Sequence, residues 1–555
     1  MAADTIILAP HLLPLALKAA DGSNAGSTDF RASLSPLLSA GHPEIADARA
    51  FLGDLTECRR TLLKALKTTD ATPQAVDDSL RAYMAKIHHL MLPPTGAPPV
   101  GSDAGPPWRG SCVGAAVAVA WRDVVWERRG RDERKGGQEV ARGDARLEVA
   151  SVLLSVAMWK ASKAAATAGG GGRGEGADSA VVAQARQLYR EAAGIIQHLL
   201  DTHVEGLGRP TAGDLDENVL AGLHKFVLAE AESFTVLRAI EKGNVPSLVA
   251  AISMDVFQLY ARAFNCLQRA AAPAAEVLED PTVDLGKQAR SSAHGIGVKG
   301  WAGYCRKVGG YTRYKAACFK AYMLAYHALD RSQGTQGGAA VRLAQEASKT
   351  VQTATNLGRE YDSLLPHTSE LQRQAFSRSL QDRVKQIDVQ CEKDNATVHL
   401  QRVPEKLPDP PAAKQLVSAV DYSFPLFDPS VDHSLFSCFD LSRAPDVVVD
   451  VAGDGGKDGG QKTAAWWRWL LVILAFPVIV VASLLGMLIW IVLLPVKIFC
   501  CPLGFAAQMM WDVTEWLIKA PAYLALWAAG KPWQPEKRDV RAMASGGVEE
   551  GSPST

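Results

Sequence analysis

The sequence predicts an all-α protein built from layered antiparallel helix pairs of solenoid type. Apolar residues recur at helical spacing almost throughout residues 215–400. Strand-like alternation is scarce before residue 415. One set spaced i, i+3, i+4 and i+7, and so on a single helix face, is Phe319, Tyr322, Met323 and Tyr326. No fixed-period repeat is present, so the pairs are expected to stack without forming identical units.

Length and composition restrict the class of protein further. The chain has 555 residues, more than the roughly 250–300 at which a single core stops growing, so several packed layers are expected. Lys plus Arg and Asp plus Glu both total 59, so no net charge favours a nucleic-acid partner. Apart from Cys500-Cys501, the nine cysteines are scattered singly and form no zinc-site spacing. We expect a reducing compartment, no metal and no cofactor.

Loops and an extended segment interrupt the helical pattern. The first 90 residues show helical spacing, and a Pro/Gly-rich loop follows at 93–110. The glycine run Gly169–Gly176 is interpreted as a flexible loop, because it lacks the Gly-Lys-Ser/Thr ending of a phosphate-binding loop. Residues 404–430 are proline-rich and are expected to run extended across the helical body. The leucines that carry the N-terminal helical spacing are Leu52, Leu55, Leu62, Leu63 and Leu66.

Residues 247–270 carry two apolar stripes, rotated from one another by roughly 100° at 3.6 residues per turn. About half of this helix surface is therefore apolar. Such a helix either packs against two neighbours, with both stripes in the core, or packs along one stripe and leaves the other for a partner. The first stripe is Leu248, Ile252, Val256, Leu259 and Ala263, and the second is Phe257, Tyr260, Phe264 and Leu267.

A membrane segment is the strongest physical signal in the chain. From Trp469 to Val496 there are 28 residues without a charge, bracketed by Arg468 and Lys497. As a helix this stretch would span about 42 Å, whereas the hydrocarbon core of a bilayer is about 30 Å thick. We expect a transmembrane segment over 466–497 and the lipid bilayer as a partner.

The segment after the span is predicted to lie on the bilayer surface. Asp512, Glu515 and Lys519 share one helical face and apolar residues the opposite one, which is typical of an interfacial helix. Cys500 and Cys501 lie beside the membrane and are candidate palmitoylation sites. Basic residues before the span favour a cytosolic helical domain, but acylation would require a cytosolic tail as well. A single span and a shallow re-entrant wedge both remain open.

These observations divide the chain into a helical domain, a tether, a membrane segment and a tail. The tether is centred on a Gly/Asp-rich run that cannot form a core. The predicted divisions are 1–440 for the helical domain, 441–465 for the linker, 466–497 for the transmembrane segment, 498–530 for the interfacial amphipathic segment and 531–555 for a disordered tail.

No catalytic signature is present in the sequence. Gly295–Gly300 matches the spacing of the dinucleotide-binding fingerprint, but the residues before it do not read as a strand, which that fingerprint requires. There is no nucleophile elbow, metalloprotease motif or kinase signature set. We therefore expect no enzyme activity and no small-molecule substrate.

Three motifs resemble the endosomal-targeting BRO-like domain family, of the type found at the N-terminus of Alix. Leu228–Ala239 resembles its helix signature, and Tyr314–Tyr326 is similar to a later helix. Lys393–Pro404 is similar to its most diagnostic motif, which opens Lys-Asp-Asn-Asp-aromatic and closes Arg-Val-Pro. Ala396 replaces the second acid of that motif here, and Thr397 replaces the aromatic. The arrangement, with an anchor after the domain, most resembles plant members.

The resemblance implies a function as well as a fold. It implies an elongated, banana-shaped helical scaffold without catalysis, which binds the C-terminal helix of an ESCRT-III subunit in multivesicular-body sorting. The scaffold would face the cytosol at an endosomal or other endomembrane. The alternative is a structural membrane-shaping protein that acts through its C-terminal wedge and amphipathic helix.

The resemblance also implies a partner site. In Alix-type domains the ESCRT-III helix docks on one aromatic and two aliphatic residues. Gap-free matching through the first motif places the aliphatic pair at Leu248 and Ile252 and the aromatic position at Thr235, with Phe234 or Val236 available to replace the missing ring. We expect weaker binding than is usual in the family. The patch is expected to face solvent, so a charge at either aliphatic position should abolish binding without unfolding the domain.

Overall fold

The chain falls into two compact units, residues 1–451 and 452–555. The second unit, with the predicted membrane segment, interfacial segment and tail, lies outside the residues that can be described, as does the linker. The computed structural model describes residues 13, 19–20, 30–39, 41–68, 70–91, 113–122, 139–143, 145–169, 179–203, 213–271, 280, 282, 301–364, 370–425 and 428–440.

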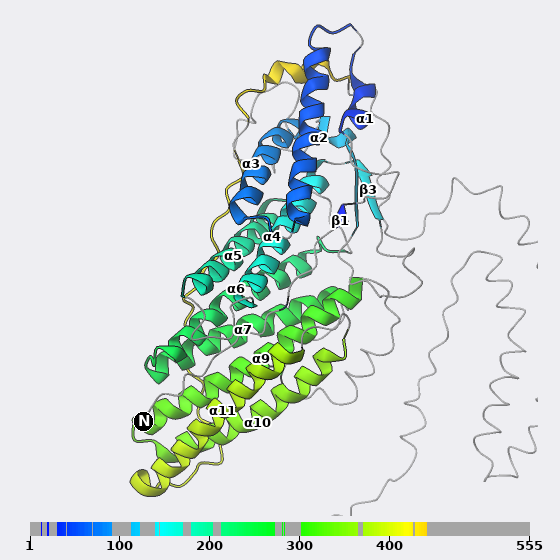
Figure 1. Ribbon diagram of the computed structural model, residues 1–555. Helices are drawn as coiled ribbons and strands as arrows, with labels where there is room; N and C mark the ends of the chain where they lie inside the picture. The colour runs from blue at the N-terminus through cyan, green and yellow to red at the C-terminus, as the bar shows by residue number, and fades with distance from the viewer. Residues whose placement is uncertain are drawn as a thin grey trace, which may run out of the picture. The chain divides into compact units, whose positions relative to one another are not determined.

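Antiparallel helices packed in successive layers make up the first unit. Each layer contacts the next along the chain, from α2 and α3 through α4, α5, α6 and α7 to α9, α10 and α11 (Figure 1). The long helices are α2 (Ile45–Lys67), α3 (Pro73–Leu90), α4 (Ala145–Gly169), α5 (Ser179–His198), α6 (Glu217–Glu241), α7 (Pro246–Ala271), α9 (Trp301–Gln333), α10 (Gly337–Asp362) and α11 (Glu370–Asp394). Shorter elements are α1 (Phe30–Leu34), the 3-10 turns η1 (Ser35–Leu37), η2 (Val113–Ala116) and η7 (His433–Cys438), and the π turns η4 (Leu199–His203) and η6 (Asn395–His399).

Local sequence signals determine where these helices begin and end. Thr72 caps α3, because its hydroxyl accepts a hydrogen bond from the Ala75 N–H at 3.2 Å, and Pro73 fills the first helical position. Asp216 caps α6 in the same way through the Asn218 N–H. Gly243 ends α6 at φ +63°, the left-handed conformation that favours glycine, and lets the chain turn back into α7.

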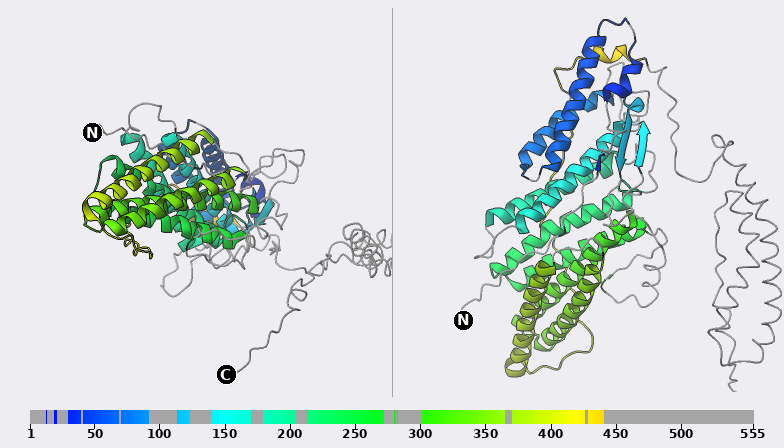
Figure 2. Two further views of the ribbon diagram at one scale, coloured as in Figure 1. Left: turned by 90° about the horizontal axis from the view of Figure 1, so that it is seen from below. Right: turned by 45° about the vertical axis from the view of Figure 1, so that its right-hand side comes forward.

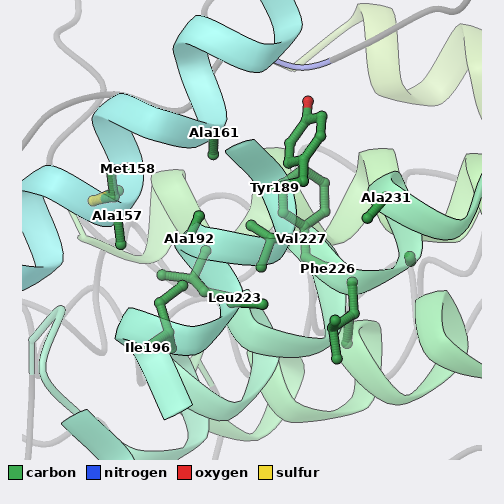
Figure 3. Close-up of a cluster of buried hydrophobic side chains, with 14 of the residues drawn as sticks. Ala157, Met158, Ala161, Tyr189, Ala192, Ile196, Leu223, Phe226, Val227 and Ala231 are labelled. Atoms are coloured by element: carbon green, nitrogen blue, oxygen red, sulfur yellow. The ribbon is translucent and has the colours of Figure 1, made fainter. Parts of the chain in front are cut away.

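Small side chains bring α4, α5 and α6 close together in the core. Figure 3 shows Ala157 and Ala161 of α4, Tyr189 and Ala192 of α5, and Phe226 and Val227 of α6 in one buried cluster. Alanine adds little bulk, so these helices can pack closely here. The Phe226 ring continues the core into the next layer, where it lies 5.8 Å from the ring of Tyr311 on α9. α4 is also the one described helix that is long and apolar enough to cross a membrane, but 83% of its most apolar window is buried inside the protein. It is therefore a core helix of the bundle.

A three-stranded antiparallel sheet lies beside the first layers (Figure 2). Its strands are β1 (Ala19–Ala20), β2 (Ala118–Arg122) and β3 (Glu139–Gly143), in that order across the sheet. Trp121 of β2 is fully buried, and its indole N–H donates to Glu148 of α4 at 2.6 Å. This hydrogen bond ties the sheet to the helical core.

Residues 400–440, here called the arm, return along the helical layers. The arm starts at the end of α11 and runs back toward α2 (yellow in Figure 1). Its backbone donates to carbonyl oxygens of successive helices: Lys414 N to Ala251 O of α7 at 3.1 Å, Val420 N to Arg190 O of α5 at 3.1 Å, and Asp428 N to Ala85 O of α3 at 3.3 Å. One extended segment therefore fastens to several layers.

The observed fold confirms the all-α class with antiparallel helix pairs, and the extended course predicted for residues 404–430. The sheet was not predicted from the sequence. Its longest strands have five residues each, and Ala-Val-Ala-Trp-Arg gives too little alternation to separate a strand from a helix. The loop expected at 93–110 and the glycine run Gly169–Gly176 lie almost entirely outside the described residues.

Candidate partner-binding site

The α6–α7 hairpin and the arm that crosses it form the candidate site. Lys414 N of the arm donates to Ala251 O on α7, and Leu416 N donates to a Glu232 carboxylate oxygen on α6 at 2.8 Å. Leu248 precedes Ala251 by three residues, and Thr235 follows Glu232 by three, so each lies one turn from a point where the arm is bound.

Three of the five predicted site residues lie in the core. Phe234 is almost fully buried with its ring 6.3 Å from that of Tyr189 on α5, and Val236 is fully buried. Ile252 is also fully buried. The expectation that Ile252 faces solvent is therefore wrong. From Ile252 onward, the first stripe of α7 lies in the core, as the alternative interpretation of the two stripes expected.

Leu248 and Thr235 remain partly accessible. Leu248 is half-buried and packs against the core, near the start of α7. Thr235 is also half-buried, and its hydroxyl oxygen is buried without a hydrogen-bond partner among the residues that the structure describes. These two residues of the predicted set can contribute surface to a partner, while Ile252, one turn further along α7, lies in the core.

Two further apolar residues near the hairpin were missed by sequence reasoning. Leu416 of the arm is 48% exposed, and Val245, in the turn before α7, is 62% exposed. Val245 lies three residues before Leu248 and accepts its N–H at 3.1 Å. Leu416 could not be placed here from sequence, because its position depends on the course of an arm that has no periodic pattern. Leu248, Val245, Leu416 and Thr235 are called the hairpin patch below.

An acidic pair lies under the arm at this place. Burial raises the pKa of Glu232 to about 8; a hydrogen bond with Asp255 of α7 and the Asp255 charge also raise it, while the Leu416 backbone N–H lowers it. Glu232 is fully buried. The raised pKa favours the protonated form of this carboxyl group at neutral pH, and strongly perturbed pKa values are typical of functional sites as well as of buried ion networks.

A second buried acid, Glu230, belongs to the core. The Tyr260 hydroxyl donates to it at 2.8 Å. Burial raises its pKa, and the nearby Lys315 charge lowers it. The Lys315 ammonium in turn lies 4.8 Å from the ring centroid of Phe376 on α11. Glu230 therefore joins α6, α7 and the last layer, and does not reach the surface.

The diagnostic motif Lys393–Pro404 shapes the beginning of the arm. The Asn395 side chain donates to Gln401 O at 2.9 Å and accepts from Gln401 N at 3.1 Å. Leu400 between them adopts φ +50° and is 78% exposed. The two substituted positions, Ala396 and Thr397, are exposed. The asparagine thus turns the chain from α11 into the arm.

No cluster of three or more His, Cys, Asp or Glu side chains suited to a metal ion occurs among the residues described here. The fingerprint-like Gly295–Gly300 and the candidate acylation sites Cys500 and Cys501 lie outside the described part of the chain.

Comparison with protein families identifies the helical unit. A family model described as the BRO1-like domain matches residues 25–437. The BRO1 domain-containing protein BROX of Mus musculus is 27% identical over 407 residues, which cover 72% of this chain and 85% of the mouse protein. BROX of Danio rerio is 23% identical over 405 residues, covering 71% and 85%.

Solved structures show the same fold. A structure described as "ALIX BRO1 CHMP4C complex" matches with a TM-score of 0.52 at 16% identity, over 76% of this chain and 98% of that one. A structure described as "Structure basis for endosomal targeting by the Bro1 domain" matches with a TM-score of 0.52 at 14% identity, over 74% and 93%. The resemblance carried by the three sequence motifs is confirmed, and the chain belongs to the BRO1-like domain family.

Proposed function

We propose that this protein is a membrane-anchored scaffold that binds an ESCRT-III subunit at an endosomal surface and has no catalytic activity. The family match over residues 25–437 carries the proposal, together with the similar fold of a BRO1 domain described in complex with CHMP4C. Sorting into multivesicular bodies is the process in which such a scaffold would act, with the helical unit facing the cytosol.

The hairpin patch is the proposed binding surface for the partner's C-terminal helix. A helix docking in a groove needs apolar contacts at helical spacing. Leu248 at the start of α7 and Val245 in the turn before it offer such contacts. Leu416 offers a third, since its backbone is bound to Glu232, one turn from Thr235, where the family pattern has an aromatic ring. The arm supplies apolar area that Thr235 lacks.

The uncharged stretch 469–496, which lies within the predicted segment 466–497, is the proposed anchor. Its length and its flanking Arg468 and Lys497 support membrane insertion. Cys500 and Cys501 are proposed acylation sites, which would add a second hold if the tail lies in the cytosol.

Substitution of Leu248 by Asp tests the partner site. We expect Leu248→Asp to weaken binding of a CHMP4C C-terminal peptide by about 2–5 kcal/mol, because the partner helix would bury an unpaired charge. The domain should stay folded, since Leu248 is only half-buried. Fluorescence anisotropy with residues 1–460 measures the affinity, and circular dichroism checks the fold.

Ile252→Asp is the matched control from the same stripe. Because Ile252 is fully buried, its charge should unfold the helical unit and not merely remove binding. Unchanged affinity of a folded Leu248→Asp variant would refute the proposed site. An unfolded Leu248→Asp variant would show that Leu248 is a core residue like Ile252.

A further inference from the structure

The carboxyl groups of Glu232 on α6 and Asp255 on α7 lie within hydrogen-bonding reach of each other, next to the arm. Glu232 Oε1 accepts the Leu416 N–H at 2.8 Å. Its other oxygen, Oε2, and Asp255 Oδ2 are both buried, and no N–H or O–H group of the described residues donates to either. Ionised carboxylates only accept hydrogen bonds, so a hydrogen bond between these two groups needs a proton held on one of them.

The surroundings favour keeping that proton. Burial and the hydrogen bond with Asp255 raise the pKa of Glu232 to about 8. These causes favour a proton held between the two carboxyl groups at neutral pH, and loss of that proton leaves two carboxylates that repel each other.

The charged groups on neighbouring elements do not neutralise the pair. Lys414 of the arm is exposed. On α5, the Arg190 guanidinium donates to Ser418 O of the arm at 2.9 Å. On α9, Lys315 acts on the core acid Glu230. Among the residues that the structure describes, Asp255 is the charged group that acts on Glu232, and none of the cations named here is engaged with the pair.

The pair also lies at the hairpin patch. Glu232 is one turn from Thr235 on α6 and holds the backbone of Leu416, while Asp255 follows Ile252 by three residues on α7. A change in the separation of the two carboxyl groups would move the helix faces and the arm segment that present the hairpin patch.

We propose that Glu232 and Asp255 are positioning residues for the partner site: a shared proton draws α6, α7 and the arm together, fixes Leu416 beside Thr235, and makes affinity for the partner helix depend on pH. The inference rests on the proposed function and names a regulation of the same site. Loss of the proton separates the carboxylates, loosens the arm at Leu416 and weakens binding as the pH rises.

The affinity of the full-length protein for a CHMP4C C-terminal peptide, measured between pH 6.5 and 9.5, tests this. We expect affinity to fall about tenfold by pH 9.5, which corresponds to a pKa about one unit higher in the complex than in the free protein. Glu232→Gln should give a flat profile, because its amide still accepts the Leu416 N–H and can donate to Asp255. Asp255→Asn should flatten the profile independently.

Hydrogen exchange at the arm separates this inference from the proposed function. Amides of residues 413–418, corrected for intrinsic exchange rates, should lose protection above pH 8 in the wild type but keep it in Glu232→Gln. A peptide that fails to bind at any pH would refute the proposed function, while the exchange result would still decide on the pair. Identical pH profiles of wild type and both variants, in binding and in exchange, would overturn the inference.

Discussion

At the residue scale, Glu148 concentrates the polar interactions of the first layers. It is fully buried in α4, and it accepts hydrogen bonds from Arg59 Nε at 2.6 Å, the Tyr83 hydroxyl at 3.0 Å and Trp121 Nε1 at 2.6 Å. These donors come from α2, α3 and the sheet. A single carboxylate thus joins four elements and balances the buried guanidinium of Arg59.

Removing this carboxylate should be costly. We expect Glu148→Ala to lower the free energy of unfolding by about 3–5 kcal/mol, because Arg59 would remain buried without its counter-charge. Urea denaturation measures the change. The control is Glu57→Ala, whose ion pair with Arg60 is exposed and should contribute less than about 1 kcal/mol. Equal losses in the two variants would contradict the assignment.

Two residues of the hairpin patch, Leu248 and Thr235, could be predicted from the sequence, and the other two could not. Leu248 and Ile252 are one turn apart and chemically alike, so a periodic pattern cannot tell that one is half-buried and the other fully buried. Depth depends on which elements cover the helix. Leu416 could not be found at all, because its contact with Glu232 joins residues 184 positions apart.

At the scale of elements, the arm depends on close backbone contacts with the helices it crosses. Gly194 of α5 leaves room for the arm, since a Cβ there would overlap the Val420 carbonyl oxygen. Gly338 of α10 plays the same part beneath Arg402. In a helix interior, glycine is less stable than alanine by about 1 kcal/mol. The close approach of the arm explains why glycine is present at both positions.

Gly194→Ala should therefore displace the arm even though alanine is the better helix former. We expect lower stability and faster proteolysis within residues 413–425, because the backbone bond from Val420 N to Arg190 O cannot form beside the added methyl group. Limited chymotrypsin digestion with mass spectrometry measures this, since Leu416 and Tyr422 are candidate cleavage sites in this segment. Gly53→Ala in α2, where a Cβ meets nothing within 4 Å, should be neutral or stabilising, and an equal effect of the two changes would count against the arm contact.

The helices and the extended arm were largely predictable from the sequence, but the path of the arm across the helices was not. Helical periodicity and Thr72 or Asp216 caps identify helices, and the prolines after residue 404 identify an extended segment. The local sequence does not indicate which helices that segment crosses, because its hydrogen bonds to α5, α7 and α3 are made by backbone atoms, which every residue type has. The short strands β2 and β3 owe their pairing to tertiary context.

At the scale of the whole molecule, the proposed anchor at 466–497 can be tested by extraction from membranes. We expect the full-length protein to resist extraction by alkaline carbonate and high salt, because insertion of 28 uncharged residues outweighs any electrostatic attachment. The 1–460 fragment should be recovered in the supernatant. Immunoblotting of pellet and supernatant distinguishes the two, and release of the full-length protein by carbonate would contradict a transmembrane segment.

The arm also has a consequence for the order of folding during synthesis. Each helix pair closes over neighbours in sequence, so its contacts can form as soon as the ribosome has released it. The arm is the last part of the helical unit to emerge, and it must find residues made hundreds of positions earlier: Asp428 bonds Ala85, and Ser434 bonds Glu44. For most of its translation, the nascent scaffold therefore lacks the segment that carries Leu416 and fastens its layers, and a partner that needs Leu416 meets a complete site only after translation has passed the arm.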